Sequence, residues 1–140
     1  MGQVIYSRPV IPGQAEGNLL VSSEPLSFWG GYDQHSGEII DRRHHLSGQN
    51  ASGRILALPF TRGSSTTTTI LVEAVRAGVA PAALISTGVD KFLALAAILA
   101  NELYGHMLPV VALQADEFKE LTSGMHAIIC HDGTITLKTS

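Results

Sequence analysis

Between residues 54 and 113, short apolar runs alternate with segments of helical periodicity, and this alternation limits the possible folds more than any other feature. The apolar runs span residues 54–60, 82–86 and 108–113, and each has the length of a buried strand. Strands that alternate with helices form parallel sheets, in which right-handed crossovers bring the helix starts to one edge. The pattern predicts an α/β domain, and ligands commonly bind at that edge.

The two helical segments carry typical start and stop signals. The first is expected to begin at Ser64 or Ser65, which are good N-cap residues, and to end at Gly78. The second is expected to run from Asp90 to Gly105. Its sequence is apolar nearly all round, which is typical of a helix enclosed by its own protein or by a partner.

Further β structure is expected on both sides of this unit. Short β-like runs in the glycine-rich N-terminal half span residues 4–6, 19–21 and 38–40. Near the C-terminus, residues 126–130 and 134–137 flank a candidate tight turn. No internal repeat or low-complexity linker divides the sequence, so we expect one domain over residues 1–140.

The composition narrows the classes of function. Hydrophobic residues make up 45% of the chain and charged residues 15%, whereas an average domain carries about 25% charged residues. Part of the surface is therefore expected to face another protein. A net charge of −3 without a basic face argues against nucleic-acid binding, and the longest apolar run is too short to span a membrane. Residues 1–12 lack the features of a signal peptide, so we expect a cytoplasmic protein.

The cysteine and the histidines do not predict a metal site on this chain. The single cysteine, Cys130, can hold neither zinc nor an iron–sulfur cluster by itself, and we expect it to be a buried thiol. His44 and His45 are adjacent and would point in different directions on a strand. The remaining histidines lack metal-ligand spacing: His35, His106, His126 and His131.

The segment 58–69 combines a strand, a glycine turn, a serine pair and a helix start, and it is the best candidate for chemistry. The N–H groups and the dipole at a helix start favour an anion and would stabilise a serine alkoxide. Four threonines at residues 66–69 each cost about half a kcal/mol relative to alanine, so we expect them to serve hydrogen bonding and close approach. The alternative is that Ser64 and Ser65 only cap the helix.

Two other clusters can be interpreted either as functional or as purely structural. Trp29 stands beside two glycines in an expected loop, where it can close over a substrate, dock into a partner or fold over its own core. Residues 41–45 read Asp-Arg-Arg-His-His. An arginine there can clamp a carboxylate and a histidine can move protons, or the segment can be a solvated turn.

Several motifs in order are similar to the swivel domain of aconitase X. They are SEPLSFWGG at 23–31, GEIIDRRH at 37–44, GRILALP at 53–59, RGSS at 62–65, EAVRAGVAPAA at 73–83 and ELYG at 102–105. The resemblance covers roughly residues 13–113. It implies a swivelling three-layer β/β/α domain that closes over an active site.

The resemblance also implies the reaction and the partner. Enzymes of this family dehydrate cis-3-hydroxy-L-proline or mevalonate 5-phosphate. A large subunit would carry an iron–sulfur cluster, which acts as a Lewis acid on the leaving hydroxyl, while this chain would bind no cofactor. The few basic residues near the glycine–serine turn favour cis-3-hydroxy-L-proline, since a phosphorylated substrate would want more positive charge.

By match to the similar turn of classical aconitase, Ser64 would be the catalytic base. Ser65, Arg62, Gly63 and Thr66 would bind substrate, with Thr66 standing where aconitase has an arginine and Arg62 as its replacement. Two alternatives remain open: a stand-alone module that binds an anion without chemistry, and a purely structural subunit.

Overall fold

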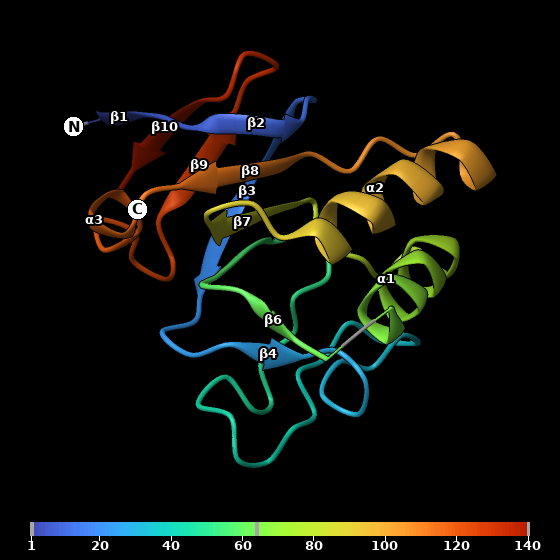
Figure 1. The fold of residues 1–140 in the computed structure, drawn as a ribbon. Coiled ribbons are helices and arrows are strands. Elements are labelled where there is room, and N and C mark those ends of the chain that lie inside the picture. The colour runs from blue at the N-terminus through green and yellow to red at the C-terminus, as the bar shows by residue number, and fades with distance from the viewer. Residues whose placement is uncertain (1, 64, 140) are drawn as a thin grey trace.

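The computed structural model describes residues 2–63 and 65–139 and shows a strongly curled sheet with two helices side by side on its outer face (Figure 1). The described residues form an eight-stranded sheet of order β1-β10-β9-β3-β5-β7-β8-β2. β1 (Gly2–Tyr6) and β2 (Arg8–Ile11) stand at opposite ends of this order, although only Ser7 separates them in the chain. The sheet therefore curls until its end strands approach each other.

The centre of the sheet is parallel, as the alternating pattern predicted. β3 (Ala15–Val21), β5 (Ile55–Leu58), β7 (Ala83–Thr87) and β8 (Val110–Leu113) pair in parallel in this order. The apolar runs at 54–60, 82–86 and 108–113 are thus confirmed as strands. Every residue of β5 and β8 is buried, because parallel strands of this kind are covered on both faces.

Antiparallel strands complete the curl. β9 (His126–Ile129) and β10 (Thr134–Lys138) form the predicted hairpin, and β1 pairs with β10. The first half of β3 pairs antiparallel with β9, while its second half pairs parallel with β5. β3 therefore joins the antiparallel and parallel parts of the sheet.

Two helices, α1 (Thr66–Ala77) and α2 (Lys91–Tyr104), pack against each other, and a short α3 (Ala115–Phe118) follows β8. Both long helices end at left-handed glycines, Gly78 and Gly105, as predicted. The buried face of α2 consists of Leu93 and three alanines, whereas its large side chains Leu95 and Ile98 are about half exposed. Within the described residues, no helix is both long and apolar enough to span a bilayer.

Two hydrophobic cores separate three layers of structure. Along β5, Leu56 and Leu58 pack with α1 and α2, while Ile55 and Ala57 face a second core shared with the antiparallel strands. This alternation follows from the two-residue repeat of a strand. The layers are therefore helices, parallel sheet and antiparallel sheet, which is the predicted β/β/α arrangement.

The segment between β3 and β5 corrects one expectation. Residues 38–40 were expected to form a strand, but they make only isolated bridges, Tyr32 with Ile39 and Glu38 with Asn50. Ile39 is fully buried in the core that the helices cover. Its apolar side chain therefore anchors a loop to the core and does not mark a strand. One short strand in this segment, β4 (Leu26–Ser27), pairs in parallel with β6 (Thr61–Arg62), which follows β5.

Candidate active-site rim

The glycine turn lies at the carboxyl edge of the parallel sheet. β5 ends at Leu58, β6 follows, and Gly63 leads into α1 with a φ of 109°. Only glycine adopts such a φ without strain, so a side chain at this position would distort the turn. Ser64, the predicted catalytic base, lies outside the described residues.

The start of α1 is not capped by the side chain of Ser65. Ser65 occupies the N-cap position in a helical conformation, but its side chain makes no capping hydrogen bond in the described part of the chain. Ser65 is therefore confirmed at the N-cap position but does not cap the helix with its side chain, and Ser64, the other expected cap residue, lies outside the described residues. N–H groups of a helix's first turn that no side chain caps can bind an anion.

The threonines of α1 have distinct surroundings. Thr68 is buried, and its hydroxyl donates to the carbonyl of Phe92 at 3.0 Å, which ties α1 to the first turn of α2. The hydroxyl of Thr69 donates to the carbonyl of Ser65 at 3.3 Å. The hydroxyl of Thr67 is buried without a partner among the described residues. The predicted role in hydrogen bonding is thus confirmed for Thr68 and Thr69.

Asp90 connects the glycine turn to α2. Its Oδ1 accepts from the backbone N–H groups of Phe92 and Leu93, which confirms the predicted cap. Its Oδ2 accepts from the backbone N–H and the hydroxyl of Thr61, at 2.8 and 2.7 Å. This second role was not predicted. The signal in the sequence that could have indicated it is an aspartate three residues after the end of a buried strand, at the carboxyl edge of the sheet.

A polar cavity of about 190 Å³ brings together motifs that are far apart in the sequence. Arg62 lines it together with Arg43 and His44 from the charged segment and Glu24 from the turn after β3. Asp41, Pro25 and Ser27 complete its lining. The β4–β6 pairing places Ser27 opposite Arg62, which explains why these segments meet.

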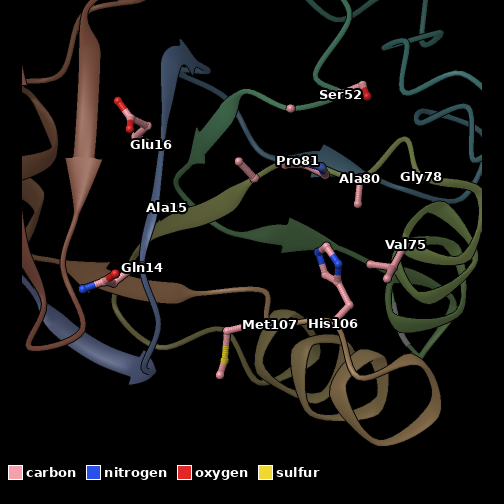
Figure 2. A pocket seen from close by; sticks show the side chains of 12 residues that line it. Gln14, Ala15, Glu16, Ser52, Val75, Gly78, Ala80, Pro81, His106 and Met107 are labelled. Atoms are coloured by element: carbon pink, nitrogen blue, oxygen red, sulfur yellow. The ribbon is translucent and has the colours of Figure 1, made fainter.

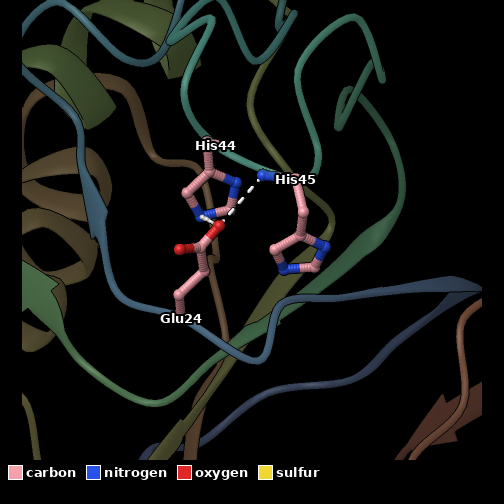
Figure 3. Close-up of side chains that lie close together, drawn as sticks. All are labelled: Glu24, His44 and His45. Carbon is pink, nitrogen blue, oxygen red and sulfur yellow. Dashed lines mark hydrogen bonds and ion pairs between the residues drawn. The ribbon is translucent and has the colours of Figure 1, made fainter.

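The two histidines of the charged segment differ in burial. His44 is 6% exposed, whereas His45 is exposed, and their rings stack with centroids 4.9 Å apart (Figure 3). Glu24 Oε1 accepts from the backbone N–H of His45 at 2.9 Å and lies 4.0 Å from His44 Nε2. The expectation that the two side chains diverge is wrong, because these residues lie in turns rather than on a strand. The interpretation of the segment as a solvated turn fails for His44.

The structure excludes one of the three alternatives for Trp29, that it folds over its own core, and corrects the expectation for Cys130. Trp29 is 66% exposed, while its neighbour Phe28 is fully buried, so it is Phe28 that packs the loop on the core. Cys130 is half-buried rather than buried and lines a separate cavity with Gln14 and Glu16. The only cysteine of the sequence therefore lies away from Arg62, and this chain does not fit the ligand set of an iron–sulfur cluster.

A larger cavity, of about 390 Å³, lies at the opposite edge of the sheet (Figure 2). Its lining includes Ala15 and Ala82, at the amino ends of β3 and β7, together with His106 and Met107 after α2. Its acidic residue, Glu16, is already paired with His126 at 2.7 Å. The cavity beside Arg62 is smaller, but more charged side chains line it: Arg62, Arg43, Glu24 and Asp41.

Residues 4–137 match the family model described as the aconitase X swivel domain. The chain belongs to this family. It is 46% identical to the cis-3-hydroxy-L-proline dehydratase of Pseudomonas aeruginosa, over 86% of this chain and 20% of that protein. It is 34% identical to the phosphomevalonate dehydratase small subunit of Pyrococcus furiosus, over 86% of this chain and 84% of that subunit.

A solved structure confirms the fold of this aconitase X swivel domain. The crystal structure of aconitase X from Thermococcus kodakaraensis in its holo form superposes with a TM-score of 0.86 at 28% identity. The match covers 96% of this chain and 98% of that one. By contrast, the chain spans only about a fifth of the hydroxyproline dehydratases that it matches, 20% and 21% of their lengths.

Proposed function

We propose that this chain is the small subunit of an aconitase-like hydro-lyase and supplies the serine base to a larger partner. The observation that carries the proposal is the Arg62–Gly63 turn, which enters α1 at the carboxyl edge of the parallel sheet. Within residues 2–63 and 65–139, no side chain caps this helix start, so the N–H groups of the first turn of α1 are suited to stabilising negative charge on a neighbouring oxygen. Swivel-family membership supports the same assignment.

In the proposed reaction, Ser64 removes a proton from the carbon next to the one that bears the hydroxyl group. The C–H electron pair forms the double bond while the hydroxyl leaves with the electrons of its C–O bond. The helix start lowers the free-energy cost of the serine alkoxide. Ser65, Thr66 and the backbone of Gly63 would hold an anionic group of the substrate, and closure of the domain would exclude water.

We propose cis-3-hydroxy-L-proline as the leading substrate and mevalonate 5-phosphate as the next. The charged residues that line the cavity beside Arg62 are balanced, with Arg43 and Arg62 against Glu24 and Asp41. Such a lining suits a carboxylate, which arginine binds bidentately, better than a phosphate dianion. The identity of 46% to a cis-3-hydroxy-L-proline dehydratase favours the same choice.

The proposed partner is the large subunit of such a dehydratase, and an iron–sulfur cluster would belong to that subunit. Large apolar side chains are exposed around the rim: Trp29 is 66%, Phe60 50% and Val89 52% exposed. Phe60 and Val89 directly precede Thr61 and Asp90, which are hydrogen-bonded to each other. Apolar side chains around a site are typical of a surface that another protein covers.

The test is an anaerobic pull-down of the tagged chain from its host, followed by turnover assays of the complex with both substrates. Ser64→Ala should lower kcat by at least about 100-fold, the scale of general-base catalysis, and the exposed Ser47→Ala should leave it unchanged. Near-normal turnover by Ser64→Ala would support the purely structural subunit. A chain that emerges alone and binds phosphate or carboxylates by itself would support the anion-binding module.

A further inference from the structure

Both ring nitrogens of the buried His44 have hydrogen-bonding neighbours. The backbone N–H of Leu46 donates to Nδ1 at 3.1 Å. The hydroxyl of Ser22, in the turn after β3, lies 3.2 Å from Nε2. The ring therefore connects its own loop to a turn that precedes it by about twenty residues in the sequence.

These partners determine where the ring carries its proton. A nitrogen that accepts an N–H must keep its lone pair, so the neutral ring has its proton on Nε2. The hydroxyl of Ser22 donates to the carbonyl of Glu24, and its oxygen therefore accepts from Nε2 of His44. The backbone N–H of Glu24 also donates to this oxygen, at 3.1 Å, so Ser22 links the ring of His44 to both backbone groups of Glu24.

A metal ion would not suit this arrangement. Glu24, His44 and His45 each offer a ligand atom, and these atoms lie within 4.8 Å of one another (Figure 3). Coordination through Nε2 would move the proton of His44 to Nδ1, where it would face the N–H of Leu46. A metal-bound histidine normally donates its other N–H to an acceptor. The cluster is therefore better explained as a hydrogen-bond network.

The Ser22–Glu24 turn leads directly to the candidate site. The backbone N–H of Ser22 donates to the carbonyl of Ala57 at 2.8 Å and so extends the β3–β5 pairing. The chain then enters β4, which pairs with β6 and sets Ser27 opposite Arg62. His44 also lines the same cavity as Arg62.

We propose that His44 is a positioning residue for the Arg62–Gly63 turn. As a neutral imidazole with its proton on Nε2, it holds the Ser22–Glu24 turn, and β4 and β6 transmit this position to Arg62 and Gly63. Its effect on turnover rests on the proposed function, because that function places the reacting serine on the same turn. Its effect on the position of the Arg62–Gly63 turn is independent of the proposed function.

Two variants separate the hydrogen-bond donor from the shape of the ring. His44→Phe keeps a planar ring and loses both nitrogens, whereas His44→Gln keeps an N–H donor near the position of Nε2. In the complex, His44→Phe should lower kcat by about 5- to 30-fold, the effect of a lost buried hydrogen bond. KM should change by less than about twofold, His44→Gln should restore most of kcat, and the exposed His131→Gln should match the wild type.

Nitrogen-15 NMR of the full chain tests the same proposal without substrate. We expect the His44 ring to show its bound proton on Nε2, and the amide resonances of Arg62 and Gly63 to move in His44→Phe and less in His44→Gln. If His44→Phe does not fold, the wild-type and His44→Gln spectra and turnover still decide the question.

Three results would overturn the proposal: a proton on Nδ1, zinc binding through His44, or unchanged Arg62 and Gly63 amides together with unchanged kcat. A wild-type complex that turns over neither substrate overturns the proposed function alone, because the ring and amide resonances are read without substrate.

Discussion

The carboxylate of Asp90 holds Thr61 through two hydrogen bonds to Oδ2, of 2.8 Å from the backbone N–H and 2.7 Å from the hydroxyl, while its Oδ1 caps α2. One side chain thus joins the segment after β7 to the strand that leads into Gly63. The position of the glycine turn is therefore coupled to the start of α2, although about thirty residues separate them in the sequence.

Substitution of Asp90 should show both roles. Asp90→Ala removes the cap and the two bonds from Thr61, so we expect a loss of about 2–4 kcal/mol in the free energy of unfolding. Asp90→Asn keeps a capping oxygen but replaces the acceptor that faces Thr61, and it should lose about half as much. Urea denaturation followed by circular dichroism measures both values. No loss in Asp90→Asn would show that the bonds from Thr61 contribute nothing, and equal losses in the two variants would show that the cap contributes nothing.

Adjacent threonines of α1 form a matched pair. Thr68→Val breaks the bond to the Phe92 carbonyl and should cost about 0.5–1.5 kcal/mol. Thr67→Val removes a buried hydroxyl that has no partner among the described residues, so it should be neutral or stabilising. Thermal and urea unfolding of the two variants compare these effects. A similar cost for both would mean that the Thr67 hydroxyl is satisfied in solution.

Tyr32 should make the fold sensitive to alkaline pH. Its hydroxyl donates to the carbonyl of Val79 at 2.9 Å, and burial, with a smaller contribution from Asp33, raises the pKa of this hydroxyl well above its ordinary value. The folded state then keeps a proton that the unfolded state releases, so stability is full below about pH 10 and falls as the pH rises further.

The control is Tyr32→Phe, which loses the bond to Val79 but cannot ionise. The variant should be less stable than the wild type at neutral pH by about 1 kcal/mol. The gap should narrow above about pH 10, as measured by urea unfolding across the range. Parallel pH curves for the two proteins would contradict the prediction.

Exposed aromatic side chains at the rim should contribute to partner binding. Trp29 is 66% exposed beside the β4–β6 pair, and tryptophan is a frequent hot-spot residue. Trp29→Ser should weaken the complex by about 30-fold in Kd, which corresponds to about 2 kcal/mol. Tyr6→Ser, at a side chain of β1 that is 76% exposed, is the matched control. Equal Kd values of the complex for Trp29→Ser and Tyr6→Ser would mean that Trp29 does not lie in the interface with the partner.

Local signals in the sequence determined the bounds of the main elements. Gly78 and Gly105 end their helices because glycine adopts the left-handed conformation at low cost, and Asp90 starts α2 because its side chain accepts from N–H groups two and three residues away. The apolar runs form parallel strands because strands of a parallel sheet are buried on both faces, and a continuous apolar sequence is stable only in such a position. The motif resemblance supplied the family, the three-layer fold and the candidate serine.

Tertiary structure alone decided which distant residues meet at the rim. The burial of His44, the pairing of β4 with β6 and the bond between Asp90 and Thr61 all join segments at least about twenty residues apart. Such contacts leave no periodic or capping signal in the sequence, since their free energy comes from burial and hydrogen bonds that form only after the loops pack. The same dependence on packing explains why residues 38–40, which have the sequence pattern of a strand, became a loop in which only Ile39 is buried.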